Sequence, residues 1–322
     1  MILGLIEHDR GTLEETSLQM LTFARDAAAR MEMPFVAVLI GELARPLVEA
    51  LQAYGVTSAV LVQHEGLDDY APVAWAASLI QLVEKKQPRM VLAAGTDRGN
   101  EVMAHVAARV GLPMAANCSE VRPGDPFEVT RLRWGSTLLE EAVLHGEPKL
   151  VTVAPLVVAP EEAPAAEAPA LETFSAELQE ADLLVRVIRR EEAVTEGITL
   201  KTAPVVIGGG RGVGSAEGYS VLEELAELVG GAVGGSRIAT NNGWRPHSDQ
   251  IGLTGSRIAP DLYIACGISG AIQHLVGCKG AKNILVINND PEAPFFSKAD
   301  YGVVGDLHEV LAAIIEELKK AG

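Results

Sequence analysis

Pro260-Asp-Leu-Tyr-Ile-Ala-Cys-Gly-Ile-Ser-Gly-Ala-Ile-Gln-His-Leu-Val-Gly277 is the stretch that decides the fold in the C-terminal part of this 322-residue chain. Residues 262–266 form a short apolar run between Pro260 and Gly267, and such a run predicts a buried strand. The residues after Gly267 predict a helix with Ser269 as its N-cap, because apolar side chains then recur at helical spacing. These are Ala271, Ile272, Leu275 and Val276.

The turn between this strand and this helix suits a phosphate group. Gly267 and Gly270 allow the backbone to turn sharply and allow a ligand to approach it closely. The start of a helix leaves several N–H groups unpaired and carries a partial positive charge, so it can bind a phosphate or pyrophosphate. Gln273 and His274 lie near the same end. Taken alone, a strand, a glycine turn and a short helix are a weak indication of a nucleotide site.

The segment from Gly267 to His274, GISGAIQH, resembles the FAD-binding signature of the electron-transfer flavoprotein alpha subunit. Further segments resemble that family in the same order and at similar spacing, and weaker similarity covers the N-terminal half. These segments are residues 208–215, 235–237, 250–255, 287–294 and 299–302. The chain is therefore identified as a member of the electron-transfer flavoprotein alpha (FixB) family.

Alternating strand-like and helix-like patterns predict an α/β fold of two domains, each a mostly parallel sheet flanked by helices. The resemblance implies a nucleotide-binding-like first domain without a cofactor, residues 1–190, and an FAD-binding domain, residues 204–322. Residues 191–203 are expected to be a mobile hinge. Residues 154–170 contain four prolines with many alanines and glutamates, which predicts a surface linker or long loop.

The expected strands of the first domain are residues 2–6, 35–40, 59–62, 90–94, 149–153 and 183–188, with an antiparallel edge over 128–144. Its expected helices are one capped by Thr12 and Glu15 as a capping box, then residues 42–54, 71–86 and 98–110. In the second domain, strands are expected at residues 204–207, near 232, and at 262–266, 284–287 and 301–304. Helices are expected at residues 216–229 and from Asp306 onward.

The loop at residues 95–101 follows a predicted strand and opens a predicted helix, where α/β sheets usually bind ligands. It has too few glycines to wrap a phosphate, so we interpret it as an ordinary capped loop. The loop at residues 208–215 is rich in glycine, but Ser215 stands where the last glycine of the dinucleotide fingerprint should be. Arg211 strengthens this second loop as a phosphate site, because its guanidinium can reach a pyrophosphate.

Composition excludes several classes of protein. The net charge of −17 argues against binding to nucleic acid, which requires a basic surface. Three cysteines without metal-ligand spacing favour a reducing compartment. No apolar run reaches the ~18 residues needed to span a bilayer, and the sequence begins without a basic leader and cleavage site. We therefore expect a cytoplasmic protein without membrane insertion and without a metal site.

The resemblance implies roles for three side chains around the flavin ring. His274 would donate to the N1/C2=O edge, where reduction places negative charge. Arg237 would lie over the ring and favour its anionic, one-electron-reduced form. The Thr254 hydroxyl would bond to N5. The alternatives are a histidine satisfied within the core or at the surface, an arginine in a surface salt bridge, and a threonine that only shapes a turn.

The resemblance also places the rest of the cofactor. Arg211, Ser236, Ser269 and Gln273 would contact the pyrophosphate and ribityl chain, whereas Asn288, Asp306 and Leu307 would hold the adenosine. Leu253 departs from the family, in which many members carry glutamine there, so a polar contact near the flavin is lost. The expected FAD-binding residues are Arg211, Ser236, Arg237, Gln250, Ile251, Gly252, Leu253, Thr254, Gly267, Ser269, Gly270, Ala271, Ile272, Gln273, His274, Asn288, Asp306 and Leu307.

The family implies an electron carrier. This chain would be the FAD-carrying alpha subunit of a heterodimer, taking electrons from flavin dehydrogenases such as the acyl-CoA dehydrogenases of fatty acid beta-oxidation and passing them to a quinone oxidoreductase. Its beta-subunit partner would hold AMP. An alternative is the alpha subunit of an electron-bifurcating flavoprotein that uses NADH and holds a second FAD in the beta subunit. A stand-alone nucleotide-binding enzyme is a third hypothesis, but no nucleophile–base pair, metal cluster or carboxylate pair supports it.

Overall fold

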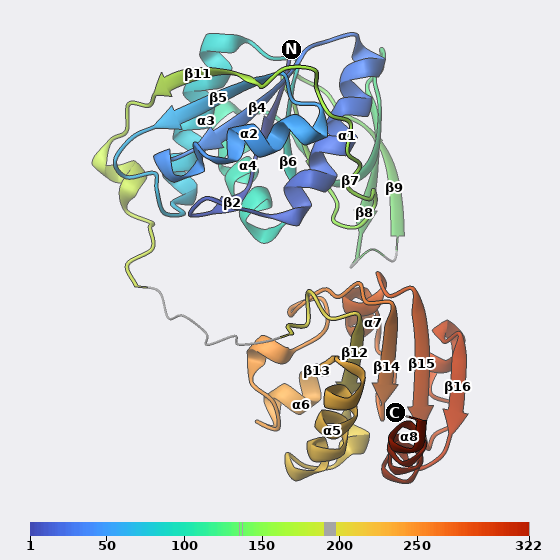
Figure 1. The fold of residues 1–322 in the computed structure, drawn as a ribbon. Helices are drawn as coiled ribbons and strands as arrows, with labels where there is room; N and C mark the ends of the chain where they lie inside the picture. The colour runs from blue at the N-terminus through green and yellow to red at the C-terminus, as the bar shows by residue number, and fades with distance from the viewer. Residues whose placement is uncertain (135, 137, 190–197, 322) are drawn as a thin grey trace. The chain divides into compact units, whose positions relative to one another are not determined.

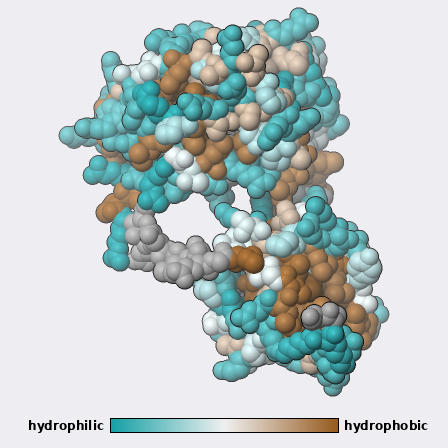
Figure 2. All heavy atoms as spheres, in the orientation of Figure 1, coloured by the Kyte–Doolittle hydropathy of each residue, from teal (hydrophilic) through white to brown (hydrophobic). Residues whose placement is uncertain are grey.

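The computed structural model describes residues 1–134, 136, 138–189 and 198–321, and the chain divides into two compact units, Met1–Glu191 and Glu192–Gly322. Each unit has strands flanked by helices (Figure 1). The expected fold class, α/β with mostly parallel sheets, is confirmed. In Figure 2, hydrophilic residues cover much of the visible face of the N-terminal unit, whereas an apolar area lies on the visible face of the C-terminal unit.

The N-terminal unit is built on one sheet in the order β11-β5-β4-β1-β6-β10-β7-β8-β9. Strands from β11 to β7 run parallel, and β7, β8 and β9 form an antiparallel edge. The bounds are β1 Ile2–Leu5, β4 Phe35–Ile40, β5 Ser58–Gln63, β6 Met90–Ala94, β7 Met114–Arg122, β8 Glu128–Arg133, β9 Leu138–Val143, β10 Lys149–Val153 and β11 Ala170–Ser175. The short strands β2 His8–Asp9 and β3 Thr12–Leu13 form a separate ribbon.

Helices cover both faces of this sheet, as a buried parallel sheet requires. One face packs against α1 Glu15–Met31 and α2 Leu47–Ala50, and the other against α3 Pro72–Lys86 and α4 Asp97–Val110. Successive residues of a strand point to opposite faces, so Ile2 belongs to the first core and Leu3 to the second. The short 3-10 helices of this unit are η1 Glu42–Ala44, η2 Leu51–Tyr54 and η3 Glu180–Leu183.

The C-terminal unit is built on a parallel sheet in the order β13-β12-β14-β15-β16. The bounds are β12 Val205–Gly209, β13 Ala232–Gly235, β14 Leu262–Cys266, β15 Asn283–Asn288 and β16 Tyr301–Val304. One face packs against α5 Ser220–Val229 and α8 Leu307–Ala321. On the other face, Cys278 at the end of α7 Ile272–Cys278 joins the second core of the unit. The remaining elements are α6 Arg237–Asn241, η4 Arg211–Val213, η5 Glu217–Tyr219, η6 His247–Asp249 and η7 Pro294–Lys298.

Three predictions in the N-terminal unit were wrong. Thr12 does not cap a helix; it lies in β3, and α1 begins at Glu15. The helix expected over 42–54 is broken into η1, α2 and η2. The strand expected at 183–188 is absent from the described residues, and β11 pairs with β5 at that edge instead. Residues before β11 are attached to α1, where the Glu161 N–H donates to Thr22 Oγ1 at 2.9 Å.

Ser269 is also not the N-cap that the sequence predicted. The helix α7 begins at Ile272, and Ala271 occupies the cap position without a side-chain hydrogen bond. Gly270, at a φ of +85°, packs its backbone so closely on Phe295 that a Cβ would lie 2.6 Å from the Phe295 Cα. This contact extends the turn beyond the strand by several residues and delays the start of the helix. Ser269 is thereby left within the turn.

The expected hinge at 191–203 lies partly outside the described residues, since 190–197 are not described. In the part that is described, Leu200 and Ala203 are buried in the core of the C-terminal unit. The Ala203 N–H donates to the Thr199 carbonyl at 2.9 Å, which closes a turn before β12. No helix in the described ranges is both long and apolar enough to cross a membrane.

Gly277 offers a test of how the C-terminal unit holds its pocket loop. Alanine there would place a Cβ 2.5 Å from the Gly252 Cα and closer still to its amide nitrogen, so the helix and the loop at 251–252 must separate. We expect Gly277→Ala to lower the free energy of unfolding by about 1–3 kcal/mol, measured by urea denaturation. Gly305→Ala is the control, because its Cβ would lie 3.4 Å from a flexible valine side chain. Equal effects of the two substitutions would contradict the prediction.

Candidate functional site

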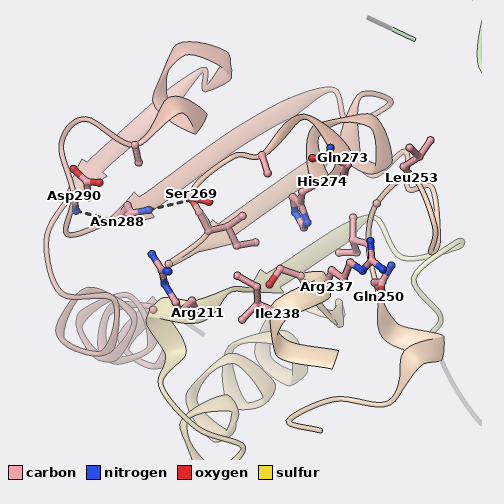
Figure 3. A pocket seen from close by; sticks show the side chains of 18 of the residues that line it. Arg211, Arg237, Ile238, Gln250, Leu253, Ser269, Gln273, His274, Asn288 and Asp290 are labelled. Carbon is pink, nitrogen blue, oxygen red and sulfur yellow. Dashed lines mark hydrogen bonds between the residues drawn. The ribbon is translucent and has the colours of Figure 1, made fainter. Parts of the chain in front are cut away.

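A cavity of about 280 Å³ lies at the carboxyl ends of the strands in the C-terminal unit (Figure 3). The loops that follow β12, β13, β14 and β15 all contribute to its wall. In an open parallel sheet this is the edge where ligands bind. The expected residues that line it are Arg211, Ser236, Arg237, Gln250, Ile251, Gly252, Leu253, Thr254, Gly267, Ser269, Ala271, Gln273, His274 and Asn288.

Four of the expected residues lie outside this lining. Gly270 shapes the turn against Phe295, and Ile272 is 57% exposed at the first position of α7. Asp306 accepts a hydrogen bond from the His308 N–H at 2.8 Å and so caps α8, and Leu307 is buried in the core. Six lining residues were missed by the sequence analysis: Gly212, Ile238, Ile268, Asn289, Asp290 and Ala293. Asp290 could have been found, because it lies three residues after the predicted strand at 284–287, in a segment that resembles the family.

Two glycine loops meet at the base of the cavity. The Gly210 N–H donates to the Cys266 carbonyl at 2.8 Å, and the Gly212 N–H donates to the Gly267 carbonyl at 3.0 Å. A Cβ on Gly212 would lie 2.7 Å from the Gly267 Cα, so only glycine fits there. Gly267 also has a φ of +61°, a conformation that glycine adopts without strain. This close approach places Arg211 beside the turn that carries Ser269.

Two arginines contribute to the wall of the cavity. Arg211 and Arg237 both line the cavity and are exposed, and neither forms an ion pair or a side-chain hydrogen bond within the described part of the chain. Figure 3 shows Arg211 pointing into the cavity from the β12 side. In a chain with a net charge of −17, two unpaired guanidinium groups at one cavity favour an anionic ligand.

His274 lines the cavity and is almost fully buried, with 6% of the residue's surface exposed. Its Nε2 lies 2.7 Å from the Tyr263 hydroxyl, and its Nδ1 has no hydrogen-bond partner of normal geometry among the described residues. Burial lowers the pKa of His274 to about 4, and the nearby Ile251 backbone offsets a small part of that shift. The ring is therefore neutral at pH 7, and Figure 3 shows it pointing into the cavity.

A side-chain network fixes the loop that carries Thr254. Gln250 is buried; its Oε1 accepts from the Thr240 hydroxyl at 3.0 Å, and its Nε2 donates to Thr254 Oγ1 at 2.9 Å. Arg245 holds Asp249 through two hydrogen bonds at 3.0 and 2.6 Å, which anchors the start of the loop. Leu253 is 41% exposed and presents an apolar surface to the cavity.

The Asn288 side chain fixes two parts of the cavity wall by hydrogen bonds. Its Nδ2 donates to the Ile268 carbonyl at 3.0 Å, and its Oδ1 accepts from the Asp290 N–H at 3.0 Å. The two bonds tie the end of β15 to the turn after β14. Asp290 is in the loop that follows β15, and it lies at the same end of the cavity as Ser269 and Arg211 (Figure 3). An acidic side chain there can accept hydrogen bonds from ribose hydroxyls.

The corresponding edge of the N-terminal sheet has a different chemistry. Thr96 caps α4 and accepts from the Gly99 N–H at 2.9 Å, so the loop at 95–101 is capped as predicted. The Thr96 hydroxyl also donates to the buried carboxylate of Glu7, whose pKa is raised by burial. The cavity beside them holds about 10 Å³, near the space of one water molecule. A carboxylate next to a helix N-terminus would repel a phosphate.

These features define a two-unit α/β chain with a cavity lined by glycines and arginines at the edge of its second parallel sheet. The family model described as "Electron transfer flavoprotein domain" matches residues 2–179, and that described as "Electron transfer flavoprotein FAD-binding domain" matches residues 199–279. The chain belongs to the electron transfer flavoprotein alpha-subunit family.

Relatives from several organisms match over nearly the whole chain. The chain is 39% identical to the electron transfer flavoprotein subunit alpha of Mycobacterium tuberculosis over 318 residues, which covers 99% of this chain and 98% of the relative. It is 37% identical to the subunit of the same name from Mycobacterium leprae, covering 98% of both chains. It is 32% identical to the protein FixB of Clostridium saccharobutylicum, covering 98% of this chain and 95% of the relative.

The buried His274 predicts an acid-dependent stability in the absence of FAD. Its pKa falls from 6.5 to about 4 on folding, so between these values the unfolded chain binds more protons than the folded chain. The free energy of unfolding should therefore fall by up to about 3 kcal/mol as the pH is lowered from about 6.5 to 4. Urea denaturation of the FAD-free protein at several pH values measures this loss.

His274→Gln removes the titrating ring and should flatten the pH dependence in this window. His308→Gln, on the exposed start of α8, is the control and should keep the wild-type slope. An identical slope in the wild type and in His274→Gln would show that His274 is not the group responsible.

Proposed function

We propose that this chain is the FAD-carrying alpha subunit of a heterodimeric electron transfer flavoprotein in the cytoplasm. It would receive electrons from flavin dehydrogenases, such as acyl-CoA dehydrogenases, and deliver them to a quinone oxidoreductase. The observation that carries the proposal is the cavity that combines unpaired Arg211 and Arg237 with the buried, half-satisfied His274. Family membership supports FAD as the ligand of this cavity.

The residues of the cavity fit the parts of FAD. Bound FAD supplies the redox chemistry, since its ring accepts and gives electrons singly. Arg211 and the backbone N–H groups of the turn after Gly267 would hold the pyrophosphate, together with the hydroxyls of Ser236 and Ser269. Asn288 and Asp290 would lie toward the adenosine, in place of Asp306, which is used in capping α8. His274 and Arg237 would offset the negative charge that the ring gains on reduction, and Thr254 would donate to N5.

A beta subunit would complete the site. The cavity of about 280 Å³ lies at the lower limit of small-molecule sites and encloses only part of a ligand as large as FAD. Leu253 adds an apolar surface at its rim, which a second chain or the flavin ring would cover. We therefore propose that FAD binds tightly only when both subunits are present, as a hinge between the two units, before the buried Leu200, brings the FAD domain against the partner.

The co-expressed alpha–beta complex should purify yellow with one FAD and one AMP, whereas the alpha chain expressed alone should hold little FAD. Absorbance spectra and nucleotide analysis of the denatured extract measure both. Electron delivery is checked by reducing the complex with an acyl-CoA dehydrogenase and its substrate. A colourless complex that refuses added FAD would overturn the proposal, and so would stoichiometric FAD in the isolated alpha chain.

Two FAD molecules per heterodimer would instead favour the alternative, an electron-bifurcating flavoprotein that oxidises NADH. The relative named FixB supports testing this alternative. The second FAD would be bound by the beta subunit, so the residues of the present cavity would keep the same roles. Reduction of the complex by NADH, together with the absence of AMP from the extract, would support the electron-bifurcating alternative.

Arg211 gives a matched test of the pyrophosphate assignment. Arg211→Gln removes a charged donor, and a hydrogen bond of this kind contributes about 1.5–3 kcal/mol. FAD should therefore bind the complex about 10- to 100-fold more weakly, as measured by fluorescence titration after removal of bound FAD. Arg257→Gln is the control, because Arg257 is exposed on the same unit but does not line the cavity. Unchanged affinity in Arg211→Gln would contradict the assignment.

A further inference from the structure

A tyrosine that does not line the cavity holds the histidine that does. Tyr263 lies in the middle of β14 and is completely buried. Its hydroxyl oxygen lies 2.7 Å from His274 Nε2, which joins the central strand of the sheet to α7. A Cβ on Gly208 of the neighbouring strand would collide with this hydroxyl group, so the position of the phenol is fixed by packing as well.

The hydrogen-bonding capacity of the pair selects one tautomer. Burial keeps the pKa of Tyr263 well above its usual value, so the phenol retains its proton. His274 Nε2 is the only acceptor for this proton within the described part of the chain. If Nε2 carried the hydrogen instead, the phenol proton would have no acceptor, at a cost of about 1–3 kcal/mol, and Nδ1 would be a bare acceptor. With the hydrogen on Nδ1, the phenol proton is bonded and the Ile251 backbone, which raises the pKa of the ring as an acceptor does, offers Nδ1–H a weak partner. The phenol therefore donates to Nε2, and the single proton of the neutral ring is on Nδ1.

The remaining neighbours of the pair bring no charge. Phe295 packs edge-on against His274 with ring centroids 6.0 Å apart. Cys278 on α7 lies in the same core as Tyr263, whereas Cys266 on β14 lies in the core on the opposite face of the sheet, and burial raises the pKa of both thiols to about 12, so they stay neutral. The Ile251 backbone lies close enough to the imidazole to raise its pKa, as an acceptor does. Nδ1–H is thus a buried donor of this cluster that has no hydrogen-bond partner of normal geometry among the described residues.

We propose that Tyr263 is a positioning residue that holds His274 in the neutral tautomer with its proton on Nδ1, available to the flavin ring. This inference rests on the proposed function, because it needs FAD in the cavity. His274 then offsets the negative charge of the reduced ring as a neutral hydrogen-bond donor. Donation from the phenol to Nε2 polarises the imidazole, and this cooperativity strengthens the Nδ1–H donor by roughly 10–30%.

The tautomer can be observed directly in the as-purified complex. Histidines labelled with ¹⁵N give separate signals for protonated and bare ring nitrogens, and the His274 signals are assigned by their loss in His274→Gln. We expect wild-type Nδ1 to be protonated and Nε2 to be bare and hydrogen-bonded. A wild-type spectrum with the proton on Nε2 would overturn the proposal without any further variant.

Tyr263→Phe removes only the hydroxyl group, and Tyr219→Phe is its matched control. Tyr219 is also a buried tyrosine of this unit, but its hydroxyl donates to the Gly209 carbonyl at 2.8 Å and not to His274. Tyr263→Phe should abolish the hydrogen-bonded Nε2 signal and lower the equilibrium constant for one-electron reduction of FAD roughly two- to fivefold. Tyr219→Phe should leave both unchanged, although it loses a buried hydrogen bond of similar kind.

The two readouts separate this inference from the proposed function. If the complex contains no FAD, the proposed function fails, while the nitrogen spectrum still reports the tautomer. If FAD is bound and the proton lies on Nδ1, but Tyr263→Phe changes neither the Nε2 signal nor the FAD potential, the positioning role is wrong and the function stands. Equal shifts of the potential in both tyrosine variants would indicate a general loss of packing and would also overturn the role.

Discussion

The contact between two glycine loops is the constraint on which the C-terminal cavity depends. The loop after β12 reaches the turn after β14 through hydrogen bonds from the Gly210 and Gly212 amides, with backbones so close that no side chain fits between them. This contact brings the ends of two strands into one wall and directs Arg211 across it. Arg211 then contributes positive charge to this edge of the sheet in a chain that is otherwise strongly acidic. The features that suit an anion are therefore local to this edge.

His274 shows how the apolar part of the cavity complements the charged part. A histidine at the surface would titrate near neutral pH and bring a variable charge to the ligand. Burial between Tyr263, Phe295 and the Ile251 backbone keeps this ring neutral, so that it can only donate or accept a hydrogen bond. The positive charge of the cavity is provided by its two arginines. Charge and hydrogen-bond direction are thus supplied by different residues, each in the environment that suits it.

The sequence predicted the strands of both parallel sheets well, because a buried parallel strand is a nearly continuous apolar run. Residues 35–40, 90–94 and 262–266 were placed to the residue. Prediction was poorer where tertiary contacts decide the local structure. Residues 170–175 form β11 although they are mostly exposed, because they find an open edge at β5, whereas the apolar residues at 183–188 were mistaken for that strand. The late start of α7 depends on the Gly270–Phe295 contact, which sequence spacing does not reveal.

The sequence predicted those residues of the candidate site that follow predicted strands or lie in the segments that resemble the family. Ile238, next to a quoted segment, and Asp290, inside one, were missed because their contribution to the cavity depends on the folding of the loops. Asp306 and Leu307 belong to a matching region, yet one caps α8 and the other fills the core. Tyr263 lies within the opening stretch itself, but its bond to His274 joins residues whose orientation depends on the crossing of β14 and α7.

Glu7 gives the N-terminal unit a property that its partner unit lacks. Its carboxylate lies at the N-terminus of α4, bonded to the capping Thr96, and so occupies the position where this kind of fold offers its strongest attraction for an anion. An acidic group of the chain itself thereby lies at the N-terminus of α4, where an anionic ligand would otherwise bind. Replacing Glu7 by a neutral residue would not by itself create a nucleotide site at this helix, since the surrounding side chains leave space for little more than one water molecule. The two units thus share an architecture, but the space at the carboxyl edge of the sheet is filled beside α4 and open beside α7.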